Sequence, residues 1–189
     1  MKNNEKLYAR GDEIDIEFRI LNRDDKELVK GFKCGNVWID KFINERAYKD
    51  KETVTYLAID KTLSKVISIL TIECTGIYTA HSSNSKRRNS VISAFGIKYF
   101  GVDAGYQSIP YSTDEKDRTL SHQLFNKWMS MLILLSRTTV GAKKIVLYSV
   151  PEAESFYKRF GFINFKSYMA KDDAISLNGC IPLYFSLVN

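Results

Sequence analysis

The chain has 189 residues and a formal net charge of +6, with 44% hydrophobic and 13% aromatic residues. This composition is typical of a packed globular protein and excludes a disordered chain, and the length suits a single domain. The three cysteines are far apart and form no C-x-x-C pair, so we expect a reduced protein without disulfides or a zinc site. The first residues lack an apolar signal core and no apolar run could span a bilayer, so we expect a cytoplasmic protein without a membrane partner.

The positive charge has two interpretations, which the composition does not separate. It is compatible with anionic partners such as nucleotide phosphates or nucleic acid, and equally with ordinary solubility. Lysines and arginines are scattered along the chain except at Ser85–Asn89, "SKRRN". This cluster lies in the polar stretch "AHSSNSKRRNS", which we interpret as a solvated loop.

The first half of the chain predicts four strands and one helix. Alternating apolar residues predict a strand at residues 14–20, and helical spacing follows it, with Asn36 as N-cap and either Trp38 or Ile39 on the apolar face. The β-branched runs "TVTYLAID" and "KVISILTIEC" predict a hairpin. Residues 95–103, "FGIKYFGVD", predict a further strand, whose glycines indicate a bulge or a close approach of a ligand to the backbone.

The second half predicts a long helix, a strand, a short helix and two closing strands. The long helix begins near Thr119, and its apolar stripe consists of Leu120, Leu124, Trp128, Leu132 and Leu135. "KKIVLYSV" predicts the strand, and Pro151 then begins a short helix that Gly161 ends. "FINFKSYMA" and "CIPLYFSLV" predict the closing strands. This order predicts a mixed α/β sheet with helices covering its faces.

Two places combine the end of a strand with the start of a helix. At the long helix, Arg118, Thr119 and Ser121 stand where free N–H groups and the helix dipole favour a phosphate, although a capped helix with nothing bound fits as well. The second place leads into the short helix that carries Tyr157. Tyr157 either has a chemical role through its phenol or only lies at the edge of the amphipathic face of the helix.

Taken together, these features resemble the GNAT N-acetyltransferase superfamily over residues 14–187. The ending "A-x-x-FY-x-x-x-GF" at Ala153–Phe162 is a frequent mark of that superfamily. The segment Phe32–Ile43, "FKCGNVWIDKFI", is similar to the opening of a branch that includes toxin-type enzymes acetylating aminoacyl-tRNA. The resemblance implies one domain over residues 1–189. Its sheet would be mixed, mostly antiparallel and twisted, with about seven strands, flanked by helices and splayed between strands 4 and 5.

The resemblance is incomplete at the turn that holds the pyrophosphate in this superfamily. Gln107 follows Tyr106 as in the superfamily, but the expected G-x-G does not follow. In the preferred alignment residues 108–117 are a loop insertion, and Thr119 and Ser121 replace the glycines beside Arg118. A competing alignment places residues 108–112 at the turn. Pro110 would then provide no backbone N–H to donate to the phosphate.

The resemblance also implies the cofactor and the site. Acetyl-CoA would be the co-substrate, without a metal, and Gln107, Arg118, Thr119 and Ser121 would hold it together with the backbone at Phe100 and Val102. Tyr157 would be the general acid toward the leaving sulfur. The acceptor is an amine, namely a small amine, a protein amine or the aminoacyl end of a tRNA, and a homodimer stays open.

Two further questions stay open. Glu73 and Asp103 are candidates for the general base, but each fits a solvated strand-end carboxylate better, and no base is assigned. The alternative functions are a GNAT-fold binding module that has lost catalysis, which the missing G-x-G favours, and a nucleic-acid-binding domain.

Overall fold

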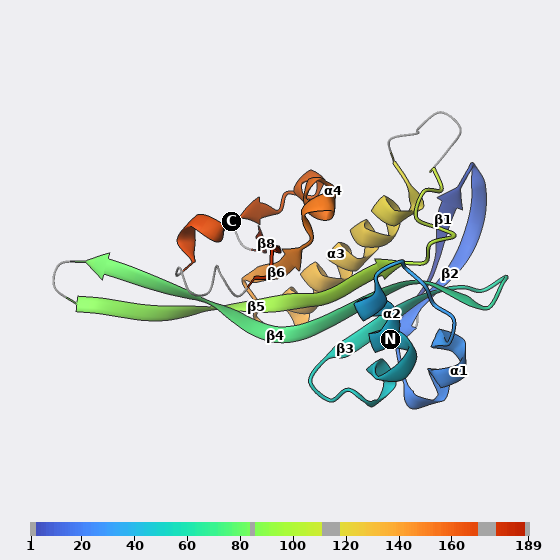
Figure 1. Cartoon of the computed structure of the whole chain (residues 1–189), viewed down its shortest axis with the longest axis horizontal. Coiled ribbons are helices and arrows are strands. Elements are labelled where there is room, and N and C mark those ends of the chain that lie inside the picture. Colours follow the sequence, from blue (N-terminus) through green and yellow to red (C-terminus); the bar gives the residue numbers. More distant parts are fainter. Residues whose placement is uncertain (1–2, 84–85, 111–117, 170–176, 188–189) are drawn as a thin grey trace. The chain divides into compact units, whose positions relative to one another are not determined.

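The computed structural model describes residues 3–83, 86–110, 118–169 and 177–187 (Figure 1). Its strands form one sheet in the order β1-β2-β3-β4-β5-β6-β8-β7. The strands are β1 (Asn3–Ala9), β2 (Asp12–Ile20), β3 (Val54–Asp60), β4 (Lys65–Ser83), β5 (Lys86–Val102), β6 (Lys144–Ser149), β7 (Ile163–Asn164) and β8 (Ile181–Ser186). The register is parallel between β5 and β6, and antiparallel for β1–β2, β2–β3, β3–β4, β6–β8 and β7–β8. The predicted mixed, mostly antiparallel sheet is confirmed.

The three predicted helices begin and end close to the predicted positions, and α1 (Lys26–Val29) is an additional helix that the sequence did not predict. The other helices are α2 (Val37–Glu45), α3 (Leu120–Thr138) and α4 (Glu154–Arg159), with 3₁₀ turns at Arg23–Asp25, Ala47–Lys49, Pro151–Ala153 and Lys166–Tyr168. The side chain of Asn36 caps α2 by accepting hydrogen bonds from the N–H groups of Trp38 (3.0 Å) and Ile39 (3.2 Å). After α4, Gly161 has a φ of +84°, a conformation that glycine adopts without strain.

Three parts of the prediction are wrong in detail. The sheet has an additional first strand, β1, in the polar segment "NNEKLYA". The stretch interpreted as a solvated loop belongs largely to strands, because β4 continues to Ser83 and β5 begins at Lys86 (Figure 1). "FINFKSYMA" contains only the short strand β7 and a 3₁₀ turn. Most of the predicted insertion, residues 111–117, lies outside the described residues.

The strands β5 and β6 pair over only part of their length. It covers Ala94–Ile97 and Lys144–Leu147, although β5 continues to Val102 and β6 to Ser149. These two strands correspond to the fourth and fifth strands of the sequence prediction, between which a splay is expected.

Contacts divide the chain into two compact units. Unit 1 comprises Met1–Ile72 and Tyr99–Met129, and unit 2 comprises Glu73–Lys98 and Ser130–Asn189. In unit 1 one apolar cluster gathers side chains from α1, α2, β3 and β4, with Ile39, Cys34 and Tyr99 packed against it. On α3 the predicted stripe is buried at Leu120, Leu124 and Trp128.

Unit 2 has its own apolar cluster. Ala94 of β5, Val146 of β6 and Phe165 form its centre, and Ile77 and Tyr184 pack against them. Among the described residues, no helix is both long enough and apolar enough to span a membrane.

Candidate functional site

The last residues of β5 are fixed by contacts within unit 1. The buried Ser68 hydroxyl donates to the carbonyl of Gly101 (3.0 Å) and accepts a hydrogen bond from Trp128 Nε1 (3.2 Å). A Cβ atom at Gly101 would lie 3.3 Å from Cys34 Cβ, tighter than most such contacts. The glycines of this strand predict that another group approaches the backbone closely. At Gly101 the loop before α2 is at least part of that group.

Phe100 and Val102 contribute their side chains to packing. The Phe100 ring lies 4.9 Å from the ring of the buried Phe125 on α3. The Val102 side chain is buried, and its carbonyl accepts a hydrogen bond from Gln107 Nε2 (2.8 Å). Contacts of these residues with a ligand would therefore fall to the main chain, as the resemblance implies.

Gln107 connects three segments of unit 1. Its side-chain amide donates to the carbonyls of Cys34 (2.6 Å) and Val102 (2.8 Å). Its own carbonyl accepts a hydrogen bond from the hydroxyl of Ser121 (2.9 Å). The loop before α2, the end of β5 and the first turn of α3 are thus held together by one side chain and one carbonyl.

The start of α3 is tied to the segment that precedes the undescribed residues 111–117. The N–H of Thr119 donates to His122 Nδ1 (3.2 Å), and the N–H of Leu120 donates to the carbonyl of Ile109 (2.8 Å). Pro110 and Thr119 also form an antiparallel bridge. Two N–H groups of the predicted phosphate cradle are therefore engaged within the chain.

The structure places all six predicted cofactor residues in unit 1. Ser121 contacts Gln107 directly, Thr119 begins the same turn, and Arg118 is exposed one residue earlier. A phosphate at this turn would have to replace the hydrogen bonds of Thr119 and Leu120, or bind through Arg118 and the positive end of the α3 dipole. The cradle stays a prediction.

A polar cluster that the sequence analysis did not identify lies beside the end of β5. The Tyr106 hydroxyl donates to Asp60 Oδ2 (3.1 Å), and Lys65 Nζ lies 2.8 Å from Asp103 Oδ1 and 5.3 Å from the centre of the Tyr106 ring. Burial, together with the Asp60 carboxylate, raises the pKa of Tyr106 to about 12. Asp103 also accepts a hydrogen bond from the N–H of Gly105, so its carboxylate stabilises the turn and is poorly suited as a general base.

Glu73, the other candidate base, belongs to unit 2. Its carboxylate lies 3.8 Å from Lys98 Nζ and is partly exposed. A Cβ atom at Gly96 would lie 3.0 Å from the Glu73 side chain, so this carboxylate packs against β5. The general base stays unassigned.

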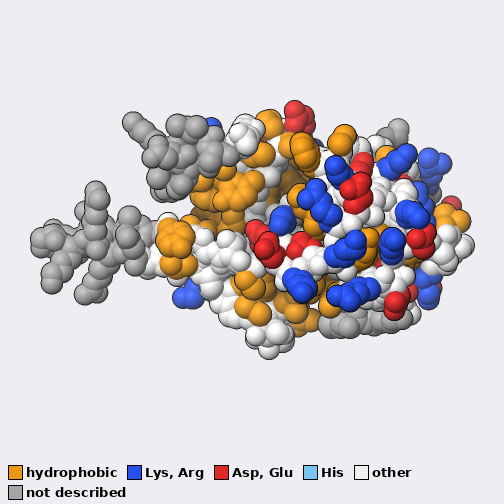
Figure 2. All heavy atoms as spheres, turned by 60° about the horizontal axis from the view of Figure 1, so that its bottom comes forward, with side chains coloured by type: hydrophobic (Ala, Val, Ile, Leu, Met, Phe, Trp, Pro, Cys, Tyr) orange, Lys and Arg blue, Asp and Glu red, His pale blue; other side chains and the backbone are white. Residues whose placement is uncertain are grey.

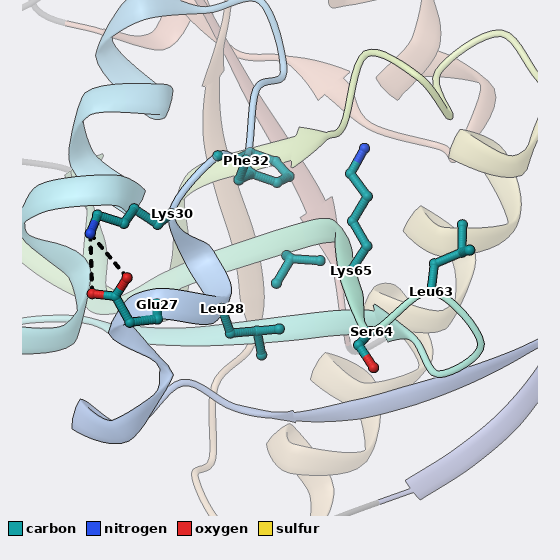
Figure 3. A pocket seen from close by; sticks show the side chains of 9 residues that line it. Glu27, Leu28, Lys30, Phe32, Leu63, Ser64 and Lys65 are labelled. Carbon is teal, nitrogen blue, oxygen red and sulfur yellow. Dashed lines mark hydrogen bonds and ion pairs between the residues drawn. The ribbon is translucent and has the colours of Figure 1, made fainter.

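A pocket of about 340 Å³ in unit 1 lies between the α1 segment and the β3–β4 turn (Figure 3). It is lined by Glu27, Leu28, Lys30, Gly31, Phe32, Leu63, Ser64, Lys65 and Val66. Lys30 and Glu27 on its wall form an ion pair at 3.0 Å. None of the six predicted cofactor residues lines this pocket, but Lys65 on its wall also belongs to the polar cluster beside the end of β5.

Tyr157 lies on α4 in unit 2, within an aromatic cluster. Its ring centre is 5.2 Å from that of Phe156 and 5.9 Å from that of Phe162, and Phe162 in turn packs against Phe185 at 5.7 Å. Phe162 is buried, whereas Phe156 and Phe160 are half-buried, so Phe162 contributes most of the three to the anchoring of α4. Burial raises the pKa of Tyr157 above its ordinary value. The phenol is therefore protonated at neutral pH.

The surface charge is mixed. On the face that Figure 2 shows, Lys and Arg side chains alternate with Asp and Glu side chains. Within the described part of the chain, no group of three or more His, Cys, Asp or Glu residues could hold a metal ion.

Comparisons with known proteins identify the fold. No protein-family profile matches the sequence, and no curated protein matches it either. Among solved structures, the chain is similar to AtaTR bound with AcCoA, with 18% identity and a TM-score of 0.69 over 91% of this chain and 94% of that chain. AtaT complexed with acetyl-methionyl-tRNAfMet is also similar, with 18% identity and a TM-score of 0.66 over 91% and 95% of the two chains.

A third similar structure is an acetyltransferase of the GNAT family from Staphylococcus aureus Mu50. It has 15% identity and a TM-score of 0.54 over 92% of this chain and 99% of that chain. At these identities the similarity concerns the arrangement of helices and strands. The chain therefore has the fold of the GNAT acetyltransferases.

Proposed function

We propose that the chain is an acetyl-CoA-dependent N-acyltransferase that transfers an acetyl group to a primary amine. The observation that carries the proposal is the state of Tyr157, a half-buried and protonated phenol on the short helix after β6 of a GNAT fold. A similar structure, AtaTR, was solved with AcCoA, which supports the same co-substrate here.

The chemistry of the step suits a phenol. Acetyl-CoA would supply the acetyl thioester, and transfer forms a nitrogen–carbon bond while the carbon–sulfur bond breaks. The amine nitrogen would release one proton to solvent as the amide forms. Tyr157 would give its proton to the departing thiolate, whose conjugate acid has a pKa near ~8.5, and would recover a proton from solvent. A phenol is protonated at neutral pH, so the proton is present when the sulfur leaves; burial raises the pKa of Tyr157 further, which makes it a weaker acid. The main chain at Phe100–Val102 would bind the pantetheine arm.

The acceptor that we propose is the aminoacyl end of a tRNA. AtaT was solved with acetyl-methionyl-tRNAfMet, and this chain has a net charge of +6 and the Phe32–Ile43 opening. A small amine and a protein amine are the other acceptors of the same chemistry.

One observation favours a second function, a binding module without catalysis. The N–H groups of Thr119 and Leu120 are engaged by His122 and Ile109, and the Gln107 amide is engaged by two carbonyls. A chain that no longer binds acetyl-CoA could keep such internal bonds permanently.

Thermal unfolding with and without acetyl-CoA separates the two functions. A ligand at a hundred times its Kd stabilises the folded state by about 2.7 kcal/mol. For a chain of this size that free energy raises the Tm by roughly 5–10 °C. An unchanged Tm at millimolar acetyl-CoA would favour the binding module.

The Tyr157→Phe variant then tests the role of the phenol. We expect acetyl transfer to fall roughly 100-fold or more, the usual contribution of a general acid, while the shift in Tm with acetyl-CoA is retained. Tyr184→Phe is the matched control, since Tyr184 is also half-buried in unit 2 but packs against Phe165. Equal activity of the two variants would exclude Tyr157 as the acid.

A further inference from the structure

Two apolar side chains at the start of α2 are exposed without an evident role in folding. Val37 and Trp38 are 75% and 74% exposed, and we call this pair the Val37–Trp38 patch. The core side of the helix is instead formed by Ile39, Phe42 and Ile43. Exposing a tryptophan forfeits the stabilisation that burial of its large apolar surface would provide, so an exposed position at a fixed helix start points to a ligand.

The patch is rigidly held. The Asn36 side chain accepts hydrogen bonds from the N–H groups of both Trp38 and Ile39, which fixes the first turn of α2. Asp40 Oδ1 accepts a hydrogen bond from the N–H of Cys34 (2.7 Å), so its charge is directed at the preceding loop. An aromatic ring on a fixed first turn can bind a flat partner at a low cost in conformational entropy.

Two exposed lysines lie near the patch in the sequence. Lys41 follows Trp38 by three residues, so the two side chains share one face of the helix, and both are exposed. Lys33 is exposed in the loop that leads into α2, and the positive end of the helix dipole lies at the same turn. An exposed aromatic ring beside cationic side chains is the combination that binds a nucleobase and its phosphate.

The loop before the patch is joined to the candidate cofactor-binding residues. The N–H of Ala104 donates to the carbonyl of Lys33 (2.8 Å), and Gln107 Nε2 donates to the carbonyl of Cys34 (2.6 Å). The patch is therefore connected, through residues 33–36, to the end of β5, where the main chain would hold acetyl-CoA.

We propose that Trp38 stacks on an unpaired nucleobase of an RNA acceptor, with Lys33 and Lys41 attracting the adjoining phosphates. The inference rests on the proposed function for the identity of the acceptor. A protein partner fits less well, because stable protein interfaces bury about 800 Å² on each partner and are depleted of lysine. Since the charges in Figure 2 are mixed, recognition would depend on such a local contact more than on a broad basic surface.

The tryptophan content of the chain allows a direct test. Trp38 is 74% exposed, whereas Trp128, the other tryptophan, is 1% exposed. With excitation selective for tryptophan, the emission of a Trp38→Phe variant comes from Trp128 alone. Subtracting it from the emission of the unaltered protein therefore gives the emission of Trp38. The probes are a deacylated tRNA, a single-stranded RNA dodecamer, and inorganic polyphosphate, which offers the charge without the bases.

We expect both RNAs to quench the Trp38 emission and polyphosphate to leave it unchanged. Because stacking contributes roughly 1–3 kcal/mol for each base, which corresponds to about 5- to 150-fold in Kd, Trp38→Ala should weaken RNA binding by about tenfold or more, and Trp38→Phe by less. Leu63→Ala, which removes an apolar side chain that is 64% exposed in the β3–β4 turn, should not change RNA binding.

Three outcomes would overturn the inference. They are RNA binding that neither quenches Trp38 nor weakens in Trp38→Ala, a lack of RNA binding, and a blue shift of the Trp38 emission with protein concentration, which would indicate contact with a second copy. The shift in Tm with acetyl-CoA is measured on the same variants. If acetyl-CoA still stabilises the variants but RNA binding does not depend on Trp38, the inference is wrong and the acetyltransferase proposal stands. If RNA binding depends on Trp38 but acetyl-CoA does not stabilise the protein, the acetyltransferase proposal is wrong and the RNA contact stands.

Discussion

The Ser68 hydroxyl occupies the point where β4, β5 and α3 meet in unit 1. It donates to the carbonyl of Gly101 and accepts from Trp128 Nε1, and both Ser68 and Trp128 are buried. Ser68→Ala leaves a buried carbonyl and a buried indole N–H without this partner. We expect the free energy of unfolding to fall by about 1–3 kcal/mol, measured by urea denaturation.

Ser93→Ala is the matched control for this prediction. Ser93 also donates to a carbonyl, that of Gly141 (2.9 Å), but the bond is exposed. Water can replace an exposed bond, so this variant should lose well under ~1 kcal/mol. Equal losses in the two variants would show that burial does not determine the cost of removing the hydroxyl of Ser68.

Single residues differ in how far their roles could be predicted. The capping role of Asn36 and the stop at Gly161 depend on local backbone geometry, so the sequence predicts both. The choice between Trp38 and Ile39 for the apolar face depends on which one reaches the core, and periodicity could not decide it. The hydrogen bond from Gln107 to the carbonyl of Cys34 joins residues 73 positions apart in the sequence, so no local pattern could have indicated it.

An amide side chain of α3 binds the main chain of the edge strand β1. Gln123 Oε1 accepts from the N–H of Tyr8 (3.1 Å), and Gln123 Nε2 donates to the carbonyl of Tyr8 (2.7 Å), as a neighbouring strand would. Lys127 and Glu5 form an ion pair between the same two elements. The side chain of Gln123 thus satisfies main-chain groups at an edge that would otherwise be open.

We expect Gln123→Ala to make hydrogen exchange at the Tyr8 amide roughly fivefold faster, the equivalent of one lost hydrogen bond of about 1 kcal/mol. The amides of β3, in the interior of the sheet, are the internal reference and should keep their protection. If exchange at Tyr8 is unchanged, or if β3 exchanges faster by the same factor, the contact does not hold β1 specifically.

Elements with a strong apolar pattern were predictable and those without one were not. The strands from β2 to β6 and the helix α3 have continuous or alternating apolar residues that must be buried. β1 has the polar sequence "NNEKLYA" and is a strand because it pairs with β2. The outer parts of β4 and β5 are also polar, and they extend past the residues that pair with β3 and β6. They are strands because β4 and β5 pair with each other, and hydropathy does not indicate such pairing.

At the scale of the whole molecule, the order of elements predicted a mixed sheet, and two short motifs added the GNAT resemblance. The comparison with solved structures confirms that fold. The candidate site was less predictable, because it depends on which N–H groups are already used. Thr119 and Leu120 have their N–H groups engaged by His122 and Ile109, and this follows only from the way the segment before residue 111 returns to α3.

The stability of the whole chain should decline at alkaline pH. Burial raises the pKa of the Cys34 thiol to about 12. Burial and the charge of Asp60 together raise the pKa of Tyr106 to about 12, and burial also raises the pKa of Tyr157. In the unfolded chain these groups ionise near ~8.5 for cysteine and ~10 for tyrosine. Between the unfolded and folded pKa values the unfolded state binds fewer protons, so the free energy of unfolding falls as pH rises from about 9 to about 12.

Urea denaturation at pH 7.5, 9, 10 and 11 measures this decline. Removing the thiol in Cys34→Ala should flatten the first part of the curve, between pH 9 and 10, when each value is normalised to that variant at pH 7.5. Cys74→Ala is the control, since Cys74 is exposed. A wild-type curve that stays level up to pH 11 would contradict the raised pKa values. A decline that Cys34→Ala leaves unchanged between pH 9 and 10 would mean that the thiol ionises alike in the folded and unfolded states, because only a proton bound differently by the two states makes stability depend on pH.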